Sequence, residues 1–220
     1  MNEHEFEPVP GLPEHLPEGE RLLWQGAPRW QSIAVRAFHV RKVVVYFALL
    51  MAWDATSSMA AGMSLLRAVG GVAWVGVLGL LAVGVLSLLA WQSARSTLYT
   101  ITSRRIVMRF GIALPMSLNL PFSVVDSASL RVHADGTSDI PVAVVKGARV
   151  GYLVNWPHVR PWHLARPQPM LCGIADGERV AGLLSSSLSA ALGGERKPVP
   201  APAAAAATAP RPHPEFTAAA

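Results

Sequence analysis

The residues from Val69 to Trp91 read VGGVAWVGVLGLLAVGVLSLLAW and contain no charged side chain. At about 1.5 Å per residue, a helix of this length crosses a hydrocarbon core of roughly 30 Å. A buried helix that is apolar on every side would be unusual in a chain of only 220 residues. The stretch therefore predicts a transmembrane helix.

A second apolar stretch precedes the first. Val43 to Ala61 reads VVVYFALLMAWDATSSMAA, with Asp54 as its one acidic residue. The part before Asp54 is too short to cross a bilayer, so either Asp54 lies within the membrane or the segment is re-entrant. We prefer a crossing helix with Asp54 in its far half. With residues 62–68 as the connecting loop, residues 41–92 form an antiparallel transmembrane hairpin.

The composition agrees with one domain beside a membrane element. Hydrophobic residues make up 51% of the chain and charged residues 15%, below the usual share in soluble domains. Cys172 is the single cysteine, which excludes an intramolecular disulfide and a multi-cysteine zinc site. The net charge of +5 suits an anionic membrane surface. No nucleic-acid-binding signature accompanies that charge, so the lipid bilayer is an expected partner and nucleic acid is not.

Basic residues flank the hairpin on its outer sides, whereas the segment between the spans contains only Arg67. Because positively charged loops stay in the cytoplasm, both termini are expected to be cytoplasmic. The N-terminus is acidic and lacks the apolar region of a signal peptide. The flanking basic residues are Arg36, Arg41 and Lys42 before the first span and Arg95, Arg104, Arg105 and Arg109 after the second.

Outside the hairpin the pattern changes. Residues 1–40 are an acidic, proline-containing arm with one short strand or turn near Arg21–Gln25 and an interfacial helix at Trp30–Val40. Residues 93–192 indicate a meander of short strands closed by an amphipathic helix at Val180–Leu192, and residues 193–220 an Ala/Pro-rich disordered tail. The candidate strands are Leu98–Thr102, Ile106–Phe110, Met116–Leu120, Ser127–Val132, Val142–Val145 and Tyr152–Asn155.

Two stretches carry a family resemblance. LYTITSRRIVMRFG (Leu98–Gly111) resembles the first hairpin of bacterial pleckstrin-homology-like (PH-like) domains, which often follow a pair of membrane helices. Together with GLPEHLPEGERLLWQGAPRW (Gly11–Trp30), and around a two-helix hairpin, it resembles the PuhB family of photosynthetic complex assembly proteins of purple bacteria.

The resemblance implies a PH-like cytoplasmic domain over residues 93–192 and a place in the bacterial inner (intracytoplasmic) membrane. It implies a non-enzymatic factor that promotes assembly of the photosynthetic reaction centre and its core antenna, whose subunits are the implied partners. It brings no cofactor and no catalytic residue.

Small residues on the two spans are candidates for helix packing, because they let helix backbones approach closely in lipid. They serve either the hairpin itself or a groove for a client or a second copy of the chain. Asp54 either makes a polar contact with a client helix or sits near the far interface beside the hydroxyl groups of Thr56, Ser57 and Ser58. The small residues are Ala48, Ala52, Thr56, Ala60 and Ser64 at intervals of four, with Gly76 and Gly79 on the second span.

Two further groups are candidates for contact with lipid or a partner. Arg104, Arg105 and Arg109 either hold an anionic lipid headgroup or are the ordinary basic residues found just inside a membrane. An anionic-lipid-binding membrane module is therefore the alternative function. Trp156 and Trp162 lie in WPHVRPWH, either as an exposed protein contact or as core.

The remaining chemistry-bearing residues argue against an enzyme, a metal and a cofactor. All histidines fall outside both spans, which disfavours pigment ligation in the bilayer core. The spacing of His158 and His163, broken by Pro161, suits no metal pair, and surface or loop packing is the expected role. Cys172 has no neighbouring histidine at a known catalytic spacing.

Overall fold

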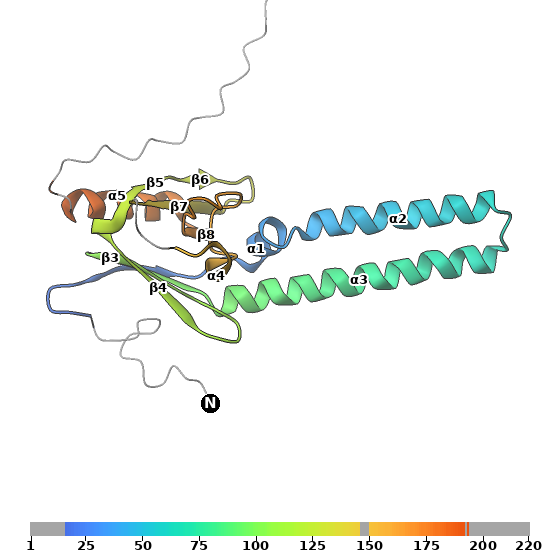
Figure 1. Cartoon of the computed structure of the whole chain (residues 1–220), viewed down its shortest axis with the longest axis horizontal. Coiled ribbons are helices and arrows are strands. Elements are labelled where there is room, and N and C mark those ends of the chain that lie inside the picture. The colour runs from blue at the N-terminus through green and yellow to red at the C-terminus, as the bar shows by residue number, and fades with distance from the viewer. Residues whose placement is uncertain (1–15, 146–149, 192, 194–220) are drawn as a thin grey trace, which may run out of the picture.

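A hairpin of two long helices projects from one end of a β-rich domain (Figure 1). The computed structural model describes residues 16–145, 150–191 and 193. The hairpin consists of α2 (Val40–Ala60) and α3 (Leu65–Arg95), which are both long and apolar enough to cross a membrane. The predicted pair of helices is confirmed. The end of the domain that carries the hairpin is called the hairpin end below, and the opposite end the distal end.

The connection between the two helices is shorter than predicted. Ser64 has an extended backbone (ψ 145°), and α3 begins at the next residue, so Leu65–Ala68 belong to its first turn and not to a loop. The helix also continues past Trp91 to Arg95, which gives it 31 residues and a length of about 46 Å. Its last turns therefore belong to the domain.

α1 (Trp30–Arg36) fastens the hairpin to the domain. The helix predicted over residues 30–40 is broken, because His39 adopts the left-handed conformation (φ 54°) and separates α1 from α2. α1 packs against the last turns of α3 in a small apolar cluster of Ile33, Ala34, Ala90 and Ala94.

One four-stranded antiparallel sheet has the order β1-β2-β3-β4. β2 and β3 occupy the stretches predicted as strands, and their core side chains stand at every second position, but most of the residues between them are buried as well. Of the short strand or turn expected near Arg21–Gln25, the structure has a strand, which pairs with β2 at the edge of the sheet. The bounds are β1 (Leu22–Gly26), β2 (Leu98–Thr102), β3 (Arg105–Phe110) and β4 (Met116–Pro121).

A short 3-10 turn, η2 (Phe122–Val124), leads into the second sheet. In this sheet β7 is central and pairs antiparallel with three strands. α5 (Gly177–Ala191) follows and packs along the same sheet (Figure 1). It corresponds to the amphipathic closing helix that the sequence predicted. The bounds are β5 (Val125–Ala128), β6 (Arg131–Val132), β7 (Ser138–Val144) and β8 (Met170–Ile174).

The core of the domain lies between the two sheets and α5. Its side chains alternate along the strands, and one face of α5 completes the cluster. Fully buried members are Tyr99, Ile101, Ile106 and Met108 from the first sheet, Val125, Ile140, Val142 and Leu171 from the second, and Val180 and Leu184 from α5.

One expectation for the second half of the domain was wrong, and two strands have other bounds than predicted. Tyr152–Asn155 forms a helical turn, α4, in which the Asn155 side-chain amide donates to the Gly151 carbonyl (2.7 Å), and Leu153 points into solvent. The strand expected over Ser127–Val132 is divided between β5 and β6, and the strand expected at Val142 begins at Ser138.

β8 was not predicted at all. All five of its residues are buried, so its sequence lacks the alternation that marks a half-exposed strand. The predicted acidic arm falls partly outside the described residues (1–15), and the predicted disordered tail does so almost entirely (194–220).

Gly173 in β8 allows α1 to approach the second sheet. It has a left-handed φ of 61°, and a Cβ atom there would lie 2.8 Å from the Ser32 Cβ. Its carbonyl accepts a hydrogen bond from the Arg29 N–H (3.0 Å) at the start of α1. The base of the hairpin is therefore held against β8 as well as against α3.

A candidate site at the base of the hairpin

Within the hairpin, Gly76 and Gly79 face α2. A Cβ atom at Gly79 would lie 2.9 Å from the Phe47 ring, and one at Gly76 would lie 3.3 Å from the Met51 sulfur. These two of the predicted packing residues therefore bring α3 close to α2 within the chain.

Asp54 lies between the two helices. Its Oδ2 atom is buried and has no hydrogen-bond partner among the described residues. A Cβ atom at Gly71 would lie 2.6 Å from it, so the absent side chain of Gly71 makes the room for this carboxyl group. The hydroxyls of Thr56 and Ser57 bind backbone carbonyls of their own helix instead of the Asp54 carboxyl group.

The small residues of α2 lie on a different face of that helix, away from α3. Ala48, Ala52, Thr56 and Ala60 are exposed and do not face α3, and Ser64 is exposed in the connection. If these residues pack against a helix, that helix lies outside the chain.

The three arginines that were one candidate for holding a lipid headgroup do not converge. Arg104 is exposed in the turn between β2 and β3, at the distal end, whereas Arg109 pairs with Leu98 in the register, beside the end of α3. The guanidinium group of Arg105 donates two hydrogen bonds to the buried Glu20 carboxylate (2.8 and 3.0 Å). Burial alone would raise the pKa of Glu20, but Arg105 and Thr102 outweigh it and lower that pKa.

In the segment WPHVRPWH both tryptophans are exposed, whereas His158, for which surface or loop packing was expected, belongs to the core. His158 is core: its Nδ1 lies 2.7 Å from the Tyr99 hydroxyl and its Nε2 3.0 Å from the Thr97 hydroxyl. Trp156 and Trp162 are exposed, Trp162 by 88% of its surface. His163 accompanies them at the surface and binds the Pro161 carbonyl (2.9 Å).

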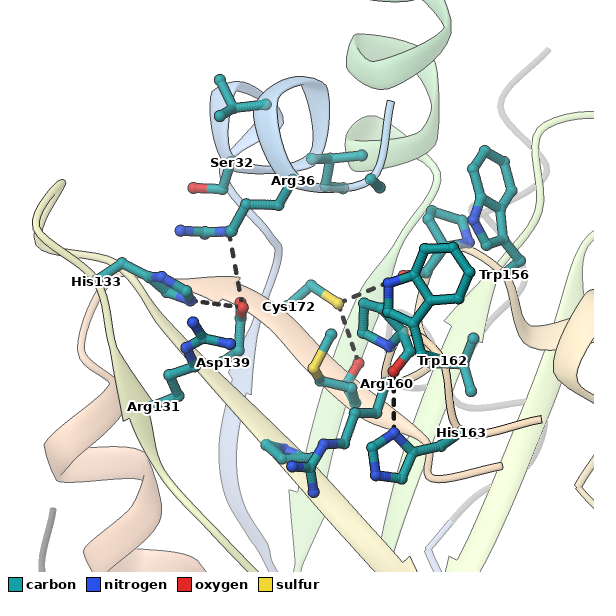
Figure 2. A pocket seen from close by; sticks show the side chains of 18 of the residues that line it. Ser32, Arg36, Arg131, His133, Asp139, Trp156, Arg160, Trp162, His163 and Cys172 are labelled. Atoms are coloured by element: carbon teal, nitrogen blue, oxygen red, sulfur yellow. Dashed lines mark hydrogen bonds and ion pairs between the residues drawn. The ribbon is translucent and has the colours of Figure 1, made fainter. Parts of the chain in front are cut away.

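A cleft of about 940 Å³ opens between these tryptophans and α1, at the hairpin end (Figure 2). α1 and the start of α2 form one side, and the second sheet and the 156–163 loop form the others. Its charged lining consists of four cations, Arg36, Lys42, Arg131 and Arg160, and one carboxylate, Asp139, and three histidines (His39, His133, His163) also line it.

Asp139, the single carboxylate, is occupied by its neighbours. One oxygen lies 2.7 Å from His133 Nε2 and 3.7 Å from Arg36 Nε, and the other accepts the Gly173 N–H at 2.8 Å. Figure 2 shows Arg36 above this carboxylate and His133 beside it. Both oxygens of the one carboxylate in the lining are therefore engaged by groups of the protein itself.

The turn between β6 and β7 orients Arg36 further. Arg36 donates to the Thr137 hydroxyl (2.7 Å) and to Asp135 (3.3 Å). The Thr137 hydroxyl in turn donates to Asp135 (2.6 Å), and this hydrogen bond is the main cause that lowers the pKa of Asp135 to about 2. Arg36 thus links α1 to the second sheet.

Sequence reasoning missed this cleft because its charged residues come from segments far apart in the chain. Arg36 and Lys42 were assigned only to the orientation of the spans, and Arg131 and Arg160 to no site. The one available signal was the pair of exposed tryptophans beside Arg160 in WPHVRPWH.

Comparison with known proteins gives one family and one relative. The family described as "Bacterial PH domain" matches residues 35–187. A protein of Rhodobacter capsulatus, described as an uncharacterized 23.7 kDa protein in the puhA 5' region, is 37% identical over 196 residues. That alignment covers 87% of this chain and 91% of the relative. No solved structure matches.

Proposed function

Because the chain belongs to the bacterial PH domain family, whose match spans residues 35–187, we propose that it is a PH-like assembly factor of the photosynthetic membrane. The observation that carries this proposal is the relative encoded in the puhA 5' region, a photosynthesis gene region. The sequence resemblance to the PuhB family supports the same function. The proposed clients are subunits of the reaction centre, of the core antenna, or of both.

In this proposal the hairpin crosses the inner (intracytoplasmic) membrane and both termini lie in the cytoplasm. The basic residues support that orientation, since Arg41 and Lys42 precede the apolar part of α2 and Arg95 ends α3. Arg67 is the one basic residue near the connection of the two helices. The PH-like domain then lies directly against the cytoplasmic membrane surface.

The exposed small-residue face of α2 is the proposed contact with client helices. Ala48, Ala52, Thr56 and Ala60 follow one another at intervals of four and stay exposed beside α3. In lipid, close backbone approach and not hydrophobicity drives helix association. A newly inserted client helix would therefore gain packing there that surrounding lipid does not supply.

The proposed role is non-enzymatic. The two most plausible reactive side chains of the described domain serve its interior: burial raises the pKa of the Cys172 thiol, and burial lowers the pKa of His158 to about 3. Both His158 ring nitrogens are occupied by hydrogen bonds. These groups are unsuited to nucleophilic or general-base chemistry at neutral pH.

Deletion of the gene in its photosynthetic host tests the function. We expect less mature reaction-centre and core antenna complex, measured by near-infrared absorbance of isolated membranes, with pigment synthesis intact. Normal complex levels in the deletion strain would refute the proposal.

Complementation then tests the α2 surface. A variant carrying Ala52→Leu and Thr56→Leu should restore less complex than the native gene, because leucine side chains hold a neighbouring helix away. A matched variant carrying Val44→Leu and Val45→Leu, at two exposed but already large positions of α2, should restore it fully. Equal complementation by both variants would exclude this face as the client contact.

A further inference from the structure

We propose that the cleft at the base of the hairpin binds the phosphate-bearing headgroup of an anionic membrane lipid. The proposal rests on the membrane placement proposed above, and it names a ligand and a site that the assembly role does not require. The occupant is argued from the charge of the cleft, its height relative to the apolar spans, and its rim.

The charge of the cleft favours an anion. With Asp139 held by His133, Arg36 and the Gly173 N–H, the remaining cations face no carboxylate of their own in the cleft. In the described part of the chain, no acidic side chain forms an ion pair with Lys42 or Arg131, although Asp139 stands opposite Arg131 in the β6–β7 register. Arg160 donates one hydrogen bond to the neutral Gln168 side chain (3.0 Å) and keeps its other donors.

The height of the cleft favours a lipid over a soluble anion. Lys42 lies in the first turn of α2, immediately before the apolar run that begins at Val43. A residue at the boundary between the polar and apolar parts of a spanning helix lies at the level of the lipid phosphates. The basic side of the cleft is therefore at headgroup height once the hairpin is in a bilayer.

The rim of the cleft supplies exposed apolar surface that an acyl chain can contact. Trp162 stands at one edge of the cleft (Figure 2), with 88% of its surface exposed, and the neighbouring Leu164 is exposed as well. The backbone of Trp162 has a left-handed φ of 64°, which is uncommon for a residue with a bulky side chain. An aromatic ring held outward at this height is typical of membrane interfaces, where the indole lies among the headgroups.

The size of the cleft agrees with such a ligand. Its volume of about 940 Å³ falls in the range of small-molecule sites, roughly 300–1,000 Å³. The phosphate would lie among Lys42, Arg131 and Arg160, and the glycerol backbone would leave past Trp162 toward the bilayer. Arg36 keeps the wall of the cleft in place through Asp135 and Thr137.

Lipid titration of the purified full-length protein in detergent, followed by native mass spectrometry, tests the site. The probes are short-chain phosphatidylglycerol, short-chain phosphatidylcholine and inorganic phosphate. We expect phosphatidylglycerol to bind at least about tenfold more tightly than either of the other two. Equal binding of both lipids, or of inorganic phosphate, would overturn the proposal; the second result would indicate a site for free phosphate.

Charge-matched variants separate the cleft from general electrostatic attraction. Lys42→Gln with Arg131→Gln should weaken phosphatidylglycerol binding by about 30-fold, since each cation near a membrane surface contributes about a factor of five. Arg104→Gln with Arg166→Gln removes the same charge from exposed positions that do not line the cleft, and it should leave binding unchanged. Equal losses in the two double variants would refute the cleft.

A third variant, Trp162→Ala, tests the rim of the cleft. It should weaken phosphatidylglycerol binding while leaving the melting temperature unchanged, because this side chain is outside the core. Undiminished lipid binding would remove the rim from the proposal. The titration needs no client, so its failure leaves the assembly role untouched, whereas a normal deletion strain refutes the assembly role alone.

Discussion

His158 joins three segments of the domain through one chain of hydrogen bonds. The Thr97 hydroxyl donates to the Ser93 carbonyl (2.7 Å), so it accepts from His158 Nε2–H. The opposite ring nitrogen then accepts from the Tyr99 hydroxyl, which itself accepts the Cys172 N–H at 3.2 Å. The chain is satisfied only with a neutral imidazole, and it connects the end of α3 to β2 and β8.

The neutral state of His158 predicts a pH-dependent stability. Burial lowers its folded-state pKa to about 3 against about 6.5 in the unfolded chain, so only the unfolded chain takes up this proton between those values. Stability should fall as the pH drops below about 6.5, by up to about 1.4 kcal/mol per pH unit for one proton. Apparent melting temperatures of the detergent-solubilised protein at pH 7.5 and pH 5 measure this.

His158→Gln should lower the melting temperature at pH 7.5 and reduce the further drop at pH 5. His39→Gln, at an exposed histidine, should change neither value. An unchanged pH dependence in His158→Gln would mean that other groups control acid stability.

The Glu20–Arg105 pair predicts a second loss of stability. Glu20→Ala leaves the Arg105 guanidinium without its two charged hydrogen bonds and should cost about 1–3 kcal/mol. Because the folded-state pKa of Glu20 is lowered, the contribution is present above its unfolded pKa and is lost as the pH falls through the folded value. Chemical denaturation at pH 7 checks the cost, with exposed Glu18→Ala as the control that should have no effect.

At the scale of elements, α3 approaches α2 through its glycines. Gly79→Leu places side-chain atoms where Phe47 already lies and should destabilise the hairpin by about 1–3 kcal/mol. Gly84→Leu is the matched control, because no atom lies within 4 Å of a Cβ built there. Thermal melts in detergent should separate the two variants, and equal melting temperatures would contradict the observed helix contact.

Sequence patterns predicted the elements whose burial follows a simple period. The spans were visible because lipid-facing helices are apolar all around, and α5 because only one of its faces is buried. β2 and β3 were visible because their core side chains recur at every second position. β8 is buried on both faces, and the apolar run at Leu153 and Val154 is exposed on a helical turn, so neither pattern predicted the observed structure.

The cleft was beyond prediction for a different reason. Periodicity reports which face of an element is buried, but not which elements meet. Arg36 meets Asp139 only because α1 docks on β8 at Gly173, a contact that depends on a left-handed glycine far along the chain. The tryptophans of the rim were recognised as candidates, whereas their partners across the cleft were not.

At the scale of the whole molecule, the proposed orientation is testable with the native cysteine left in place. The Cys172 thiol is buried beside the Pro157 and Met170 carbonyls, and burial raises its pKa, so it should resist maleimide reagents. Met63→Cys, in the exposed connection of the hairpin, should react with a membrane-impermeant maleimide on spheroplasts. Exposed Ser123→Cys should react only after lysis.

The reverse labelling pattern would place the domain outside the cytoplasm and would remove the basis of both proposals. Labelling of the unmodified protein would show instead that Cys172 is more accessible than the structure indicates.

The attachment of α3 to the sheet has a mechanical consequence. Only Ser96 and Thr97 separate α3 from β2, and both are held by hydrogen bonds to the Ser93 carbonyl. α1 packs against the last turns of α3, so a change in the tilt of α3 would be passed to the first sheet. A bilayer that thins or thickens changes the tilt of a spanning helix. Such a change would move the Arg104 turn sideways relative to the membrane, so that the position of this turn would depend on the thickness of the bilayer.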